Sequence, residues 1–181
     1  MTMTVANEIV GALVFALGAI VYCLRFPKAW EVALKILRCR QLDVALMIVA
    51  AGWFLWIVAH LGEADFGNYK VPLFVAFFGI SVGAILWVRD FLGVRAFCVI
   101  YMLASWHFLG AAFGHYEVPA RLFMVGTVYA GLVAALYFAT VPYRVRDFSR
   151  WLNRHPVVAT ISGVLVAALG DWLMILPAVF Y

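Results

Sequence analysis

Three ionisable side chains stand out because they lie in apolar segments, where such groups are rare. His60 and His107 lie at equivalent positions, each six residues before one copy of a repeated motif, and Asp171 lies well inside the last apolar run. Two neutral imidazoles on facing helices can ligate a haem iron from both sides. A carboxylate inside a membrane must be paired, protonated or in contact with water, as in proton-carrying sites. These residues are therefore the candidates for chemistry.

Motifs of the common enzyme classes are missing from the sequence. It has no phosphate-binding glycine loop, no H-E-x-x-H and no credible Ser-His-Asp order. Its three cysteines have no C-x-x-C spacing, so they predict neither a disulfide framework nor a zinc site. We predict no catalytic residue and no metal site, and an enzyme is not favoured.

The composition is that of a membrane protein. Of the 181 residues, 67% are hydrophobic and 12% charged, whereas soluble domains are about half apolar and about a quarter charged. Six apolar runs each suit one helical crossing: residues 9–24, 44–61, 71–88, 96–113, 119–143 and 157–180. We predict an all-α, polytopic protein with one domain, 1–181. Because its basic residues lie between the apolar runs, we expect no nucleic-acid partner.

A short motif occurs twice in the middle of the chain. FGNYKVP at 66–72 returns 47 residues later as FGHYEVP at 113–119. Both copies connect two apolar runs, which predicts a two-helix hairpin used twice, at approximately 53–91 and 100–148. The helices of the two copies, within 53–88 and 100–143, should superpose, with Pro72 over Pro119. Gly67 and Gly114 should allow tight turns.

The basic residues alternate between loops. Eleven of the 13 lysines and arginines follow the first, third and fifth apolar runs. The positive-inside rule places these loops in the cytoplasm and both termini outside, in a bacterial-type inner membrane. Within these loops, residues 28–39 and 143–154 have helical periodicity with many charges and a narrow apolar face. We expect both to be amphipathic helices in the membrane interface, in contact with lipid.

Small and acidic residues give further local predictions. Asp43 and Asp90 precede apolar runs and are expected as helix N-caps. Glycines within the runs are expected at close helix contacts, because small residues let membrane helices approach each other. They are Gly11, Gly18, Gly79, Gly83, Gly126 and Gly131.

The candidate residues are expected at similar depth, in the outer half of the membrane. If the last apolar run packs between the two hairpins, Asp171 faces His60 or His107 and the group forms a ligand or proton site. Arg121 is a further partner for Asp171. The alternative is structural: each histidine makes one hydrogen bond, and a protonated Asp171 makes an inter-helix hydrogen bond.

Three functions remain open from the sequence. The first is a non-enzymatic structural or accessory protein that assembles with other membrane proteins, or with copies of itself. The second is an electron carrier with haem b bound by His60 and His107. No helix carries two histidines at opposite depths, as two haems would require. The third is a small proton-linked transporter that uses Asp171.

Overall fold

The computed structural model of the protein describes residues 1–62, 67–88, 91–118 and 120–180. Within these ranges, six helices are long and apolar enough to cross a membrane. Each coincides with one of the predicted apolar runs, so the prediction of an all-helical protein with six candidate spans is confirmed. The helices are α1 (Met3–Cys23), α3 (Arg40–Ala59), α4 (Lys70–Trp87), α5 (Leu92–Ala112), α6 (Arg121–Thr140) and α8 (Pro156–Phe180).

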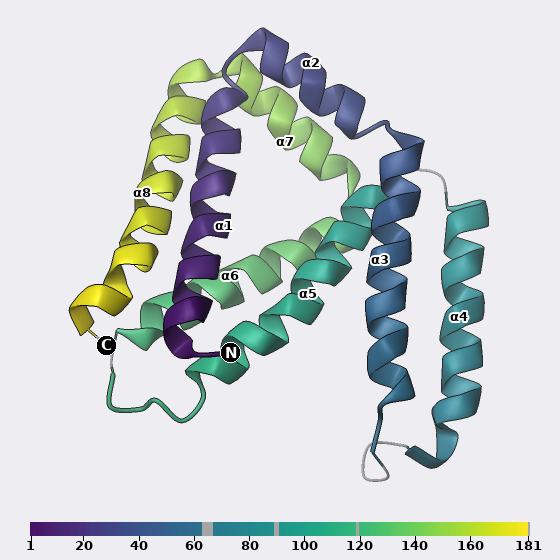
Figure 1. The fold of residues 1–181 in the computed structure, drawn as a ribbon. Helices are drawn as coiled ribbons and strands as arrows, with labels where there is room; N and C mark the ends of the chain where they lie inside the picture. Colours follow the sequence, from purple (N-terminus) through teal and green to yellow (C-terminus); the bar gives the residue numbers. More distant parts are fainter. Residues whose placement is uncertain (63–66, 89–90, 119, 181) are drawn as a thin grey trace.

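Two shorter helices, α2 (Pro27–Ile36) and α7 (Tyr143–Arg154), occupy the basic segments expected to be helical. Pro27 lies in the first turn of α2, where its missing N–H leaves no hydrogen bond unmade. α2 and α7 lie at the end of the bundle where α1 ends and α8 begins (Figure 1). We call this the basic end. α1 begins and α8 ends at the opposite end.

α1 and α8 run antiparallel and make the most extensive contact between any two helices of the described chain (Figure 1). Gly11 and Gly18 in α1 lie opposite Gly170 and Gly163 in α8. A Cβ on Gly11 would lie 2.8 Å from the Gly170 carbonyl oxygen, and one on Gly163 would lie 2.7 Å from the Tyr22 nitrogen. The two helix backbones are therefore in direct contact. A residue larger than glycine at these positions would keep them apart.

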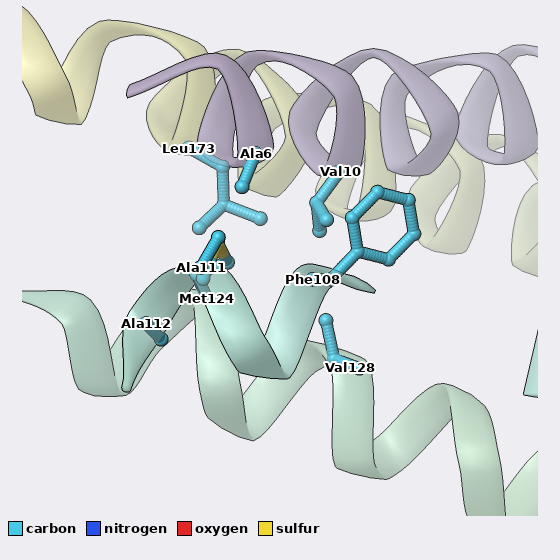
Figure 2. Close-up of a cluster of buried hydrophobic side chains, with 8 residues drawn as sticks. All are labelled: Ala6, Val10, Phe108, Ala111, Ala112, Met124, Val128 and Leu173. Carbon is cyan, nitrogen blue, oxygen red and sulfur yellow. The ribbon is translucent and has the colours of Figure 1, made fainter. Parts of the chain in front are cut away.

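A buried apolar cluster joins the α1–α8 pair to α5 and α6. Figure 2 shows side chains from α1 and α8 meeting those from α5 and α6. α8 therefore packs mainly against α1 and reaches the second hairpin through Leu173. It does not lie between the two hairpins, as the expected polar cluster required. The cluster consists of Ala6, Val10, Phe108, Ala111, Ala112, Met124, Val128 and Leu173.

The two hairpins, α3–α4 and α5–α6, contact each other through α3 and α5, which begin close together at the basic end and then diverge (Figure 1). α4 packs against α3 and has no buried residue. The connections differ, because Gly67 lies in a short 3-10 helix, η2 (Gly67–Tyr69), whereas Gly114 has a positive φ of 87°. Pro72 lies inside α4, and Pro119 lies outside the described residues. The duplication stays a prediction for the helices, but the turns do not share one conformation.

The glycines divide into two groups. Gly11, Gly18 and Gly131 are confirmed at close contacts; a Cβ on Gly131 would overlap the Tyr101 hydroxyl. The expectation is wrong for the other three. A Cβ on Gly79 or Gly126 would meet nothing within 4 Å, and one on Gly83 would meet only the Trp87 ring of its own helix. These positions lie on helix faces that no other helix of the described residues covers.

Candidate functional site

Asp171 lies on the exposed side of α8. Successive residues of an α-helix are rotated by about 100° around its axis. Asp171 is therefore about 100° away from Gly170, which contacts α1, and about 200° away from Leu173, which is buried. Among the described residues, no hydrogen bond or ion pair joins Asp171 to His60, His107 or Arg121. The predicted polar cluster is therefore wrong as a geometric arrangement, because α8 turns this carboxylate away from the bundle.

His60 caps the C-terminal end of α3 and packs on Trp56, one turn earlier. The ring centroids are 4.2 Å apart, and the His60 Nδ1 lies 2.8 Å from the Trp56 carbonyl oxygen. Since a carbonyl oxygen only accepts, Nδ1 donates the hydrogen. His155 repeats this arrangement at the end of α7, with Nδ1 3.0 Å from the Trp151 carbonyl oxygen. The same contact ends two helices, which favours a structural role for His60.

His107 stacks on Trp53 of α3, with ring centroids 5.9 Å apart and planes 22° apart. His60 lies seven residues beyond Trp53 on the same helix, which is about 10 Å along its axis. The histidines are on neighbouring helices, as expected, but their rings do not lie opposite each other. Two axial ligands of one iron must do so, and haem ligation therefore stays a prediction that this geometry does not favour.

Arg121 begins α6 and binds the end of α5. Its Nη1 donates to the Ala112 carbonyl oxygen at 3.1 Å, and its guanidinium lies 4.4 Å from the centroid of the Tyr116 ring. A cation is favourable beside the carbonyl groups that end a helix. Arg121 thus fixes the connection between α5 and α6 and makes no contact with Asp171 among the interactions of the described residues.

Asn7 is a buried polar residue that sequence reasoning missed. It is 0% exposed, and its Nδ2 donates to the Leu173 carbonyl oxygen of α8 at 3.3 Å. In a regular helix that carbonyl oxygen accepts a hydrogen bond from the backbone N–H four residues later. Here that residue is Pro177, which has no N–H. Asn7 supplies the missing donor, as neighbouring helices do for prolines in membrane helices. Among the described residues, the Asn7 Oδ1 has no hydrogen-bond partner.

A charged cavity of about 320 Å³ lies at the basic end. Three guanidinium groups and one carboxylate border it, together with three apolar side chains. The cavity lies where two of the candidate spans, α3 and α5, begin. It is lined by Leu34, Leu37, Arg38, Arg40, Asp43, Phe91 and Arg146.

Asp43 connects two walls of this cavity. It is 8% exposed and accepts a hydrogen bond from the Gly93 backbone, and Arg40 provides a favourable charge interaction. A Cβ on Gly93 would overlap the carboxylate. The N-cap of α3 is Cys39, so the expected capping role of Asp43 is wrong. Asp43 instead joins the start of α3 to the start of α5. Asp90, the other expected cap, lies outside the described residues.

Comparison with known proteins adds no family to this description. No protein-family model, no curated protein and no solved structure matches the chain. Two features of the structure therefore remain as guides to function: the exposed carboxylate on α8 and the charged cavity at the basic end.

Proposed function

We propose that the protein is a non-enzymatic subunit of an assembly in a bacterial-type inner membrane, and that Asp171 contacts the rest of the assembly. The exposure of Asp171 on a membrane-length helix carries this proposal. Asp171 lies eight residues before Val179, where the candidate span ends, and therefore about 12 Å from that end. Lys and Arg can extend their charge to the interface from such depths, but the short Asp side chain cannot.

A carboxylate that faces lipid is unfavourable. A charged side chain near the centre of a membrane helix costs about 2.5–3.5 kcal/mol even on insertion scales. A neighbouring membrane protein with a cation or hydrogen-bond donor at this depth would offset that cost. Trp172 and Ile175, which are exposed next to Asp171, supply apolar surface for the same contact. Proton-linked transport is less favoured, because α8 presents Asp171 on the outside of the bundle.

The mass of the purified particle tests this proposal. Protein extracted from its native membrane in a mild detergent should have a polypeptide mass well above the 20.2 kDa of one chain. Asp171→Leu should reduce it to a single chain, because leucine offers the partner no acceptor. Asp171→Asn, which keeps an acceptor oxygen, should retain most of the assembly. Light scattering corrected for detergent measures these masses.

Val164→Leu is the matched control, since Val164 is also exposed on α8 and has no polar group to lose. It should keep the wild-type mass. A wild-type particle of one chain, or an Asp171→Leu particle as large as the wild type, would contradict the proposed assembly role.

We further propose that the basic end lies in the cytoplasm and that both termini are outside. The distribution of 11 of 13 basic residues supports this orientation. The exposed aromatic rings of α7 suit headgroup depth at either interface and support only the interfacial position of this helix. Phe148 and Trp151 stack with centroids 5.9 Å apart, and both are exposed. Reporter fusions after Arg40 and Arg150 should both give a cytoplasmic signal. A periplasmic signal at both sites would reverse the orientation.

A further inference from the structure

We propose that the cavity at the basic end binds a phosphate-bearing anion, either the headgroup of an anionic phospholipid or a free phosphate compound. This inference is independent of the assembly role of Asp171, which lies on α8, away from the cavity lining. It is carried by three arginines that line one partly open cavity at the start of the candidate spans α3 and α5.

The arginines differ in how they are held. Arg40 donates to the Ile85 carbonyl oxygen at the end of α4. Arg146 pairs with Asp147 at 3.2 Å, but both side chains are partly exposed, at 36% and 43%. Ion pairs of this kind contribute little, so the Arg146 guanidinium can exchange Asp147 for a ligand. Arg38 lies exposed just after α2. The planar guanidinium forks of arginine match phosphate oxygens in pairs.

Asp43 is the opposing charge in the cavity, but its interactions are already made. Its carboxylate accepts from the Gly93 backbone, and Arg40 lies close enough to compensate part of its charge. Asp147 pairs with Arg146 and adds a second carboxylate, so three guanidinium groups against two carboxylates still leave a net positive charge at neutral pH. An anion therefore meets a net attraction, and a cation does not.

Size and surroundings favour a headgroup or a molecule of similar size. The volume of about 320 Å³ is near the lower limit of small-molecule sites, which begin at about 300 Å³. Leu34, Leu37 and Phe91 provide apolar surface beside the arginines, and the Phe91 ring centroid is 5.7 Å from the Arg146 guanidinium. Polar and apolar lining at interface depth suits the phosphate and glycerol region of a lipid, with acyl chains outside the cavity.

Native mass spectrometry of the full chain tests lipid binding. In neutral detergent with added phosphatidylglycerol, each chain should retain one lipid, and with zwitterionic phosphatidylcholine it should retain none. Arg38→Gln should weaken retention about fivefold, the upper end of the effect of one exposed ion pair between an arginine and the bound phosphate. The double variant with Arg146→Gln should weaken it about 25-fold. Arg150→Gln is the control: it removes the same charge from α7, outside the cavity lining, and should change retention less than twofold.

A second measurement separates the two sources of phosphate. Titration calorimetry with inorganic phosphate, in detergent without anionic lipid, should give binding that Arg38→Gln weakens if a free compound is the ligand. Retention of phosphatidylglycerol without phosphate binding assigns the lipid. The proposal is overturned if neither ligand binds. It is also overturned if Arg150→Gln weakens binding as much as Arg38→Gln, because the attraction would then belong to the whole basic end. Arg38 is exposed, so its replacement should leave the fold intact, which circular dichroism can verify.

Discussion

Gly18→Ala is expected to lower the free energy of unfolding by about 3 kcal/mol, at the upper end of the usual cost of overpacking. The added methyl group would overlap the Ala167 backbone and lie 2.8 Å from the Gly163 carbonyl oxygen. Because the obstacle is backbone, no side chain can rotate away, and α1 must separate from α8. That separation would also weaken the Gly11–Gly170 contact, which belongs to the same helix pair.

Gly126→Ala is the matched control for this substitution. It adds the same methyl group to α6 at a place where nothing lies within 4 Å. Since alanine is a better helix former than glycine by about 1 kcal/mol, this variant should be as stable as the wild type or slightly more stable. Unfolding by dodecyl sulfate in mixed micelles, followed by circular dichroism, measures both variants. Equal midpoints for the two would show that α1 and α8 do not touch as described.

The helices themselves could be predicted because each one follows from a local pattern. An apolar run of about 20 residues can satisfy its backbone in a membrane only as a helix. Amphipathic periodicity likewise predicted α2 and α7, and Pro27 indicated where α2 begins. None of these patterns needs information about a distant part of the chain.

Helix pairing was harder, since a membrane helix that is apolar on all sides does not show which side faces a neighbour. The same criterion selected Gly18, which touches α8, and Gly126, which touches nothing. One available signal was missed: glycines are seven residues apart both in the first run, at Gly11 and Gly18, and in the last, at Gly163 and Gly170. That shared spacing would have favoured α1 beside α8.

The histidines show where a repeat misleads. His60 and His107 each lie six residues before a copy of the motif, but α3 ends at Ala59, while α5 continues to Ala112, five residues beyond His107. One histidine therefore caps a helix, and the other lies within one. Equal positions in a sequence repeat give equal environments only when the helices end at equal positions.

The Nδ2 donor of Asn7 should contribute to stability only while residue 177 is proline. Asn7→Leu keeps a similar side-chain size, removes the donor to the Leu173 carbonyl oxygen, and also removes an Oδ1 that has no partner among the described residues. These two effects have opposite signs, so the stability of the single variant does not decide the role of Asn7. The coupling between Asn7 and Pro177 does.

Pro177→Ala restores an N–H four residues after Leu173, so α8 can then satisfy that carbonyl by itself. We expect Asn7→Leu to change the free energy of unfolding unfavourably by about 1–2 kcal/mol more in the wild-type background than in the Pro177→Ala background. This is the range that inter-helix hydrogen bonds reach in membranes. Unfolding titrations of the wild type, both single variants and the double variant give this difference directly. Any packing energy lost by Pro177→Ala affects the single variant and the double variant equally, so it cancels in this difference. Additive effects would show that Asn7 does not replace the missing donor, and the buried amide would then need another explanation.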